Sequence, residues 1–190
     1  MSQIVKNIKP VFEETVFPVV KLLNKIGITP NILTVTGLIL VGISSFFILK
    51  GNFFVGALFL IAGNLCDAID GVLARRFNKS STFGAFLDSV IDRISDFLPL
   101  IAIGIFYIKN DYMLILSIYT AFISLMVSYT RARAEGLGID CKVGVLERTE
   151  RSVILILTLL FDIVTIGLIA IAIGATLTVF QRIYCVYKNS

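Results

Sequence analysis

Histidine is absent from this chain of 190 residues, and cysteine occurs only three times. Zinc sites are usually built from closely spaced cysteines and histidines, whereas Cys66, Cys141 and Cys185 show no such spacing. The sequence therefore disfavours a zinc site. It also contains no internal repeat and no low-complexity tract, and its loops are too short for a second folded unit. We expect residues 1–190 to form a single domain.

Charged residues are scarce as well. They make up 16% of the chain, whereas 57% of the residues are hydrophobic and the mean hydropathy is +0.93. A soluble domain carries about 25% charged and about 45–50% apolar residues. The composition therefore excludes an ordinary soluble domain and predicts an all-α integral membrane protein. The formal net charge of +4 comes without a basic soluble domain, so nucleic acid is not expected as a partner, and membrane lipids or phosphorylated substrates fit better.

Long apolar runs define the expected helices. A run of roughly 20 apolar residues can cross a bilayer as a helix. We predict six spans, at about 32–50, 53–74, 85–108, 112–134, 152–167 and 168–187. Only the segment FDIVTIG separates the last two, so their boundary is expected near residue 167.

Residues 1–25 precede the spans and mix charged with apolar side chains, among them Lys6, Lys9 and Val16. This pattern is typical of an amphipathic helix on the membrane surface, not of a cleavable signal peptide. With six spans, both termini and the loops near 75–84 and 135–151 share one side, which carries most of the lysines and arginines. The other side has only Lys50 and Lys109. The positive-inside rule then predicts a multi-pass cell-membrane protein with both termini in the cytoplasm.

Aspartates interrupt two neighbouring spans. In NLCDAIDGVLARR, residues 64–76, Asp67 and Asp70 share one face of a helix at about 100° per residue, and Asp88, Asp92 and Asp96 share one face of the next. The short loop RFNKSSTFG joins the two helices. They should therefore present carboxylates to each other near the cytoplasmic end of the membrane.

Such a cluster needs compensation, because a charge at the bilayer centre costs about 2.5–3.5 kcal/mol on insertion scales. Salt bridges to Arg75, Arg76 and Arg93 are one way to provide it. Divalent cations are the favoured way, since carboxylates without histidine or cysteine select Mg²⁺, Mn²⁺ or Ca²⁺. We expect two Mg²⁺ ions that hold a pyrophosphate, with Mn²⁺ as an alternative that the sequence does not separate.

The spacing around the aspartates is specific: Asp67-x2-Asp70-Gly71-x2-Ala74-Arg75-x8-Gly84-x3-Asp88-x3-Asp92. It resembles the defining motif of the CDP-alcohol phosphotransferases, six-helix membrane enzymes that join a CDP-linked alcohol to a second alcohol and release CMP. The resemblance implies that Asp67 and Asp88 bridge both metals and that Asp70 holds one. Asp92 would bind the second metal and act as general base on the incoming hydroxyl.

The resemblance also implies a site for the CDP-linked lipid. Gly71 and Ala74 would let the nucleotide approach the helix closely; the alternative is that they only let two membrane helices come together. The residues that match nucleotide-contacting positions or the motif's small residues are Asn31, Ile32, Leu33, Thr34, Gly71, Ala74, Arg75, Ser81 and Gly84.

Three further segments resemble one subfamily, the phosphatidylinositol phosphate and archaetidylinositol phosphate synthases: YTRARAEGLG at 129–138, GVLERTER at 144–151 and VFQRIYCVY at 179–187. In that subfamily basic residues bind the phosphate of inositol phosphate, which implies this role for Arg131, Arg133 and Arg182. Arg148 and Arg151 are second-rank candidates, because ERTER can pair its own glutamates with its arginines along a helix. The alternative is that these arginines enforce topology or bind anionic lipid.

The expected activity is transfer of a phosphatidyl or archaetidyl group from CDP-diacylglycerol or CDP-archaeol to inositol 1-phosphate, with release of CMP. The same chemistry with glycerol 3-phosphate or serine is a rival, and so is a cation channel or transporter lined by the aspartates. The sequence leaves the donor's tails undecided. Asp96 is either a support for the metal site or simply a polar helix position. A homodimer is expected from the resemblance alone.

Overall fold

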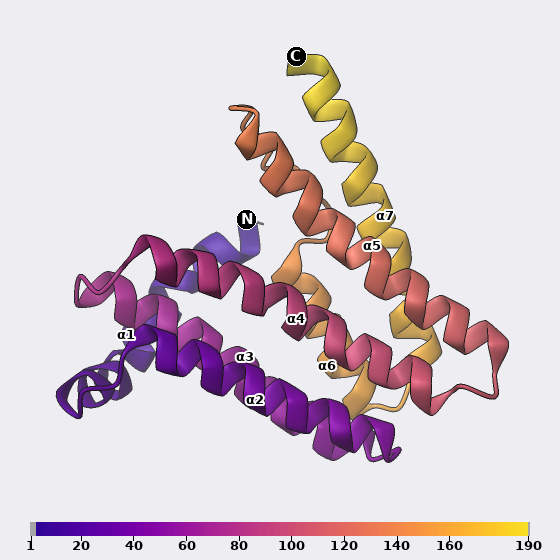
Figure 1. The fold of residues 1–190 in the computed structure, drawn as a ribbon, viewed down its shortest axis with the longest axis horizontal. Helices are drawn as coiled ribbons and strands as arrows, with labels where there is room; N and C mark the ends of the chain where they lie inside the picture. Colours follow the sequence, from indigo (N-terminus) through magenta and orange to yellow (C-terminus); the bar gives the residue numbers. More distant parts are fainter. Residues whose placement is uncertain (1–2, 190) are drawn as a thin grey trace.

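The computed structural model describes residues 3–189, with side chains from residue 10 onward, so the expectations for the side chains of Lys6 and Lys9 lie outside the described residues. Over residues 3–189 every regular element is an α-helix and no strand occurs, which confirms the predicted all-α class (Figure 1). The helices are α1 (Gln3–Lys25), α2 (Pro30–Leu49), α3 (Phe53–Arg76), α4 (Thr82–Phe106), α5 (Asp111–Gly136), α6 (Arg148–Leu160) and α7 (Val164–Asn189).

Polar caps set where several helices begin. Asn52, Ser81 and Asn110 each accept a hydrogen bond from the backbone N–H three residues further on, at the starts of α3, α4 and α5. Thr29 caps α2 in the same way and is followed by Pro30, a residue favoured in the first turn of a helix. These caps fix the helix starts that place the aspartates.

Four helices, α2, α3, α5 and α7, are long and apolar enough to cross a membrane. Helix α4 has 25 residues, but its first half carries several charged side chains. Helix α6 has 13 residues, which is about 20 Å at 1.5 Å per residue and less than the roughly 30 Å hydrocarbon core. The structure thus agrees with a membrane protein, and four of its helices meet the requirement for a span.

The predicted boundary between the last two spans is wrong. The chain breaks at residues 161–163, several residues before the expected position near 167. Asp162 adopts a positive φ of 53°, a conformation that aspartate tolerates better than β-branched residues do. The break therefore falls at the one charged residue inside FDIVTIG, and α6 begins earlier than expected, at Arg148.

Helix α2 packs along both α3 and α4, and α5 packs against α4 and α7 (Figure 1). Glycines allow the close contact of α2 with α3. A Cβ atom on Gly37 would lie 3.1 Å from the carbonyl oxygen of Gly63, and one on Gly63 would lie 2.8 Å from Cγ2 of Val41. Because α3 and α4 both rest on α2, their facing sides are free to carry polar groups.

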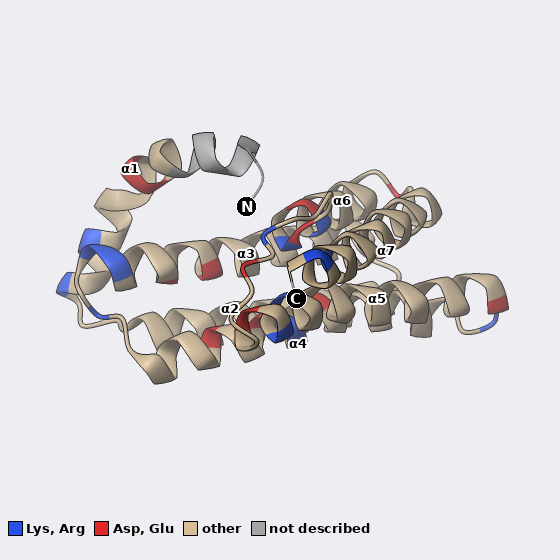
Figure 2. Ribbon diagram, turned by 90° about the horizontal axis from the view of Figure 1, so that it is seen from above, with Lys and Arg blue, Asp and Glu red and all other residues tan. Residues whose placement is uncertain are grey.

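Helix α1 lies against the C-terminal end of α3 (Figure 2). Val20 is fully buried in an apolar cluster with Val72 and Leu73. The ion pairs that join the two helices include Glu13–Arg75 and Glu14–Arg76. Arg75 and Arg76 therefore pair with α1, which does not support the alternative that they compensate the aspartates. Of the three arginines in that alternative, Arg93 lies near the aspartates, with Nη1 4.0 Å from Oδ2 of Asp92.

The loop between α5 and α6 is fastened to α7. Cys141 in the loop and Cys185 in α7 form a disulfide, with their Cα atoms 6.1 Å apart, which the sequence analysis did not anticipate. Nearby, Nε of Arg182 donates a hydrogen bond of 2.9 Å to the carbonyl oxygen of Val143. These contacts hold the segment that leads into the first turn of α6.

Candidate active site

Carboxylates from α3 and α4 converge, as the helical spacing predicts. One oxygen from each of Asp67, Asp70 and Asp88 lies within 4.8 Å of the others. Asp92 and Asp96 follow Asp88 at one-turn intervals along α4, and Figure 2 shows acidic positions on both helices. Oxygens from two helices at this separation form a donor set suited to a hard divalent cation.

Asp70 is held from a third helix. Its side chain is 5% exposed, and its Oδ2 accepts a hydrogen bond from the hydroxyl of Thr34 in the first turns of α2. Thr34 is itself 4% exposed. Thr34 was predicted to contact the nucleotide; the structure places its hydroxyl on a carboxylate, where it fixes the direction of that side chain.

Arg148 reaches from the start of α6 into the same cluster. Its Nη1 lies 2.9 Å from Oδ2 of Asp67 and 2.9 Å from Oδ1 of Asp92, and its Nε donates to Oδ1 of Asp96 at 3.2 Å. The positive charge of the Arg148 guanidinium is thus compensated by three carboxylates. Arg148 thus pairs with aspartates of two other helices.

The buried side chain of Asp92 provides a test of whether divalent cations fit this site. Its Oδ1 is buried without a hydrogen-bond partner, because the contact with Arg148 lacks the direction of a hydrogen bond. A buried carboxylate oxygen that accepts no hydrogen bond is costly unless a nearby cation compensates it, and here the Arg148 guanidinium lies 2.9 Å away. Together with the three converging oxygens of Asp67, Asp70 and Asp88, it gives a set of oxygen donors without nitrogen or sulfur, so the residues present fit Mg²⁺ or Mn²⁺.

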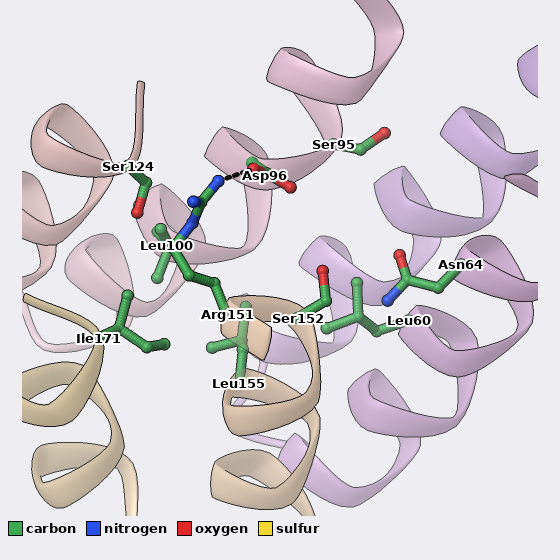
Figure 3. Close-up of a pocket in the computed structure, with 10 residues that line it drawn as sticks. All are labelled: Leu60, Asn64, Ser95, Asp96, Leu100, Ser124, Arg151, Ser152, Leu155 and Ile171. Atoms are coloured by element: carbon green, nitrogen blue, oxygen red, sulfur yellow. Dashed lines mark hydrogen bonds and ion pairs between the residues drawn. The ribbon is translucent and has the colours of Figure 1, made fainter. Parts of the chain in front are cut away.

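Asp96 faces α6, one turn beyond Asp92. Its Oδ2 accepts a hydrogen bond of 2.7 Å from Nη2 of Arg151 (Figure 3). Its Oδ1 accepts from Nε of Arg148, so two arginines of α6 share one carboxylate. Asp92 and Asp96 are four residues apart, and Arg148 and Arg151 are three apart, so each pair occupies one helix face. The sequence spacing could have indicated that each pair shares a helix face. Only the fold shows that the face of α4 with the two aspartates meets the face of α6 with the two arginines.

Three residues expected at the nucleotide lie together at the start of α4. A Cβ atom on Gly84 would lie 2.9 Å from Oγ of Ser81 and 3.0 Å from Oδ1 of Asn31. Ser81 caps α4, and Asn31 stands in the first turn of α2. The structure therefore brings two polar side chains and one bare backbone position to a single place.

The other expected nucleotide contacts divide into two groups. Gly71 is open: a Cβ atom there would meet only the flexible guanidinium of Arg75 in its own helix, which disfavours a role for Gly71 in helix contact. Ala74 is half-buried, next to Arg75. Ile32 is exposed, whereas Leu33 is buried in the apolar cluster beneath α1, so its side chain does not face a ligand.

A cavity of about 270 Å³ lies between α3 and α6 beside the carboxylates. Asp67 and Arg148 line its polar part. The apolar lining residues are Ile61, Leu65, Ala68, Val153 and Ile156. It therefore combines an apolar wall with one end at the charged cluster.

The three arginines expected at the acceptor differ in exposure. Arg131 pairs with Glu135 of the same helix at 3.0 Å, and Arg133 is exposed. Arg182 is 2% exposed, and its Nη1 donates to the carbonyl oxygen of Val127. Arg131 lies within electrostatic reach of Arg182, so the two form one basic region, with Arg182 as its buried part.

Comparisons with known proteins identify the family of this chain. The family model described as CDP-alcohol phosphatidyltransferase matches residues 27–180. An archaetidylinositol phosphate synthase from Pyrococcus horikoshii is 37% identical over 179 residues, which cover 93% of each chain.

Solved structures give the same result. The phosphatidylinositol phosphate synthase of Mycobacterium tuberculosis with bound CDP-DAG superimposes with a TM-score of 0.83 at 27% identity, over 90% of this chain and 92% of that one. The same enzyme in complex with manganese and citrate gives a TM-score of 0.80, over 90% and 88%. The family model spans most of the sequence, and the relatives match nearly its whole length. This chain therefore belongs to the CDP-alcohol phosphatidyltransferase family and is a membrane transferase.

Proposed function

We propose that this enzyme transfers the phosphatidyl or archaetidyl group of a CDP-linked lipid to inositol 1-phosphate and releases CMP. The observation that carries the proposal is the convergence of Asp67, Asp70 and Asp88 from two helices. The relatives support the acceptor, because those compared here are named for archaetidylinositol phosphate or phosphatidylinositol phosphate synthesis.

The aspartates are assigned as metal ligands. Asp67 and Asp88 would bridge two divalent cations, Asp70 would hold the first and Asp92 the second. When bound, such cations neutralise the carboxylates and stabilise charge on the transferred phosphate. Thr34 keeps Asp70 in position through its hydrogen bond.

Asp92 is assigned as the general base. Its buried Oδ1, which accepts no hydrogen bond and lies 2.9 Å from Nη1 of Arg148, would take the proton of the inositol phosphate hydroxyl. The hydroxyl oxygen of inositol 1-phosphate forms a bond to the lipid-side phosphorus. At the same time the bond from this phosphorus to the CMP oxygen breaks, and CMP leaves. The proton ends on the Asp92 carboxylate.

The donor is placed along α2, α3 and α4. Asn31, Ser81 and Gly84 would contact the nucleotide, because they meet at one place, and Arg75 would contact it beside the open Gly71. The cavity between α3 and α6 would receive part of the lipid tails, since it joins an apolar wall to the carboxylates. Either acyl or archaeol chains suit such a wall.

The acceptor phosphate is placed at the basic region. Arg131 and Arg133 are accessible enough to contact it, and Arg182 adds positive charge from its buried position. Guanidinium groups suit bidentate contact with phosphate. An uncharged acceptor such as serine does not need this region, whereas glycerol 3-phosphate could use it.

The membrane arrangement is proposed with six crossings. Helix α4 would cross despite its charges, because its aspartates line the site, and α6 would cross together with the break before α7. The site, the termini and the basic loops would face the cytoplasm. Residues 1–25 would lie at the membrane surface as part of the same domain, held to α3 by ion pairs, and two chains would form a homodimer.

The test is release of CMP by the purified protein from CDP-lipid in the presence of Mg²⁺. Inositol 1-phosphate, glycerol 3-phosphate and serine are supplied as competing acceptors, and mass spectrometry identifies the lipid product. We expect the inositol phosphate product to dominate and Asp92→Asn to abolish turnover, whereas Asp140→Asn, at an exposed aspartate paired with Lys142, should not. Full turnover by Asp92→Asn would remove the base assignment, and ion flux into liposomes without CMP release would favour a channel.

A further inference from the structure

Asp96 is the one aspartate of α4 that the proposed reaction leaves without a task. Its side chain is 13% exposed, and its two oxygens accept from two different guanidinium groups, those of Arg148 and Arg151. A single carboxylate thus faces two positive charges, which lie three residues apart at the start of α6.

The surroundings of Asp96 exclude direct contact with a substrate on that side. Asp96 and Arg151 line a cavity of about 20 Å³, and Figure 3 shows Ser95 and Ser124 on its wall. A volume of that size holds about one water molecule and no phosphate or sugar group. Arg151 is 4% exposed. On this side Asp96 therefore contacts Arg151 and Arg148 and has no room for a substrate group.

Arg148 provides the connection from Asp96 to the carboxylates. Its Nε is bonded to Asp96, and its Nη1 lies 2.9 Å from both Asp67 and Asp92. Removing the Asp96 charge would free the guanidinium to pair with Asp67 and Asp92 alone. Those two carboxylates would then offer less negative charge to a divalent cation.

We propose that Asp96 is a positioning residue, which anchors the Arg148 guanidinium and thereby sets how strongly Asp67 and Asp92 bind a divalent cation. The assignment rests on the proposed function for the role of the cations. In this assignment Asp96 does not touch the substrate and is not itself a metal ligand.

The test is a titration of the purified protein with Mn²⁺, with free Mn²⁺ followed by electron paramagnetic resonance. Asp96→Asn should weaken Mn²⁺ binding by about 10- to 100-fold, the usual effect of losing a support to a metal ligand. Asp96→Glu, which keeps the charge, should restore most of the affinity. Ser95→Ala, on the wall of the same cavity, is the matched control and should leave the affinity unchanged.

A double-mutant cycle decides whether Asp96 acts through Arg148. In an Arg148→Gln background, Asp96→Asn should have little further effect on Mn²⁺ affinity, because the group that it anchors is gone. An equal loss in both backgrounds, or no loss in either, would overturn the proposal. If Asp96→Asn does not fold, Asp96→Ser, which also removes the charge, is measured with and without Arg148→Gln.

The activity assay is run on the same samples and keeps the two proposals apart. If wild-type protein releases no CMP with inositol 1-phosphate, the proposed acceptor is wrong, yet the Mn²⁺ cycle still reports on Asp96. If wild type turns over and the cycle is additive, the proposed function stands and the role of Asp96 falls. We expect turnover by wild type, reduced kcat for Asp96→Asn and recovery of kcat in Asp96→Glu.

Discussion

Individual side chains at this site act mostly through contacts with other helices. Asp70 of α3 depends on Thr34 of α2, and Arg148 of α6 contacts aspartates of both α3 and α4. Helical spacing was sufficient to predict that Asp67 and Asp88 face a common region. It was not sufficient for Arg148, because ERTER suggests a local pairing, whereas the aspartates that Arg148 contacts lie far away in the sequence.

At the residue scale we predict that Thr34→Val impairs metal binding. Valine keeps the shape of threonine but cannot donate the hydrogen bond to Asp70, so that carboxylate loses its fixed direction. Mn²⁺ affinity should fall by about 10- to 100-fold in a titration. Thr36→Val is the matched control, since the Thr36 hydroxyl bonds only to the carbonyl of Ile32 in its own helix. Equal affinity in the two variants would contradict the role given to Thr34.

Two glycines of α3, Gly63 and Gly71, have different structural roles. Gly63 lies where α2 and α3 touch, whereas Gly71, two turns further along α3, faces only Arg75. The sequence alone offered both roles, helix contact and ligand approach, for Gly71. The distinction depends on which face of α3 rests on α2, and that face is decided by tertiary structure.

At the element scale we predict opposite outcomes for two glycine substitutions in α3. Gly63→Ala places a Cβ atom 3.0 Å from the carbonyl oxygen of Gly37, a backbone atom that cannot move freely, so it should destabilise the protein by about 1–3 kcal/mol. Gly71→Ala should leave the melting temperature near that of wild type. It should instead raise KM for the CDP-linked lipid, because the methyl group covers the open position beside Arg75.

Thermal unfolding in detergent and steady-state kinetics check this pair. The account is contradicted if Gly71→Ala melts at a much lower temperature than wild type. It is equally contradicted if Gly63→Ala is as stable as wild type.

The whole molecule could be predicted as an all-α membrane protein because composition and hydropathy dominate at that scale. The division of α6 from α7 could not, since both are apolar and the break depends on the positive φ of Asp162. The disulfide between Cys141 and Cys185 could not be predicted either. The two cysteines are distant in the sequence, and only the fold shows that they lie close enough to pair.

At the scale of the whole molecule we predict the orientation in the membrane. Lys50, after α2, and Lys79, in the loop before α4, are both exposed and should lie on opposite sides. In a Cys66→Ser background, a membrane-impermeant maleimide should label Lys50→Cys on intact cells and Lys79→Cys only after permeabilisation. The reverse pattern, or equal labelling of both on intact cells, would contradict the cytoplasmic site.

The central claim is that carboxylates of α3 and α4 jointly bind divalent cations. Its most direct measurement is anomalous X-ray scattering from crystals of this protein grown with Mn²⁺. We predict an anomalous peak within about 2.5 Å of oxygens of Asp67, Asp70 and Asp88, in the range of carboxylate–cation distances, and its loss in Asp88→Asn. Ordered carboxylates without a peak between them, at Mn²⁺ concentrations that support turnover, would contradict the account.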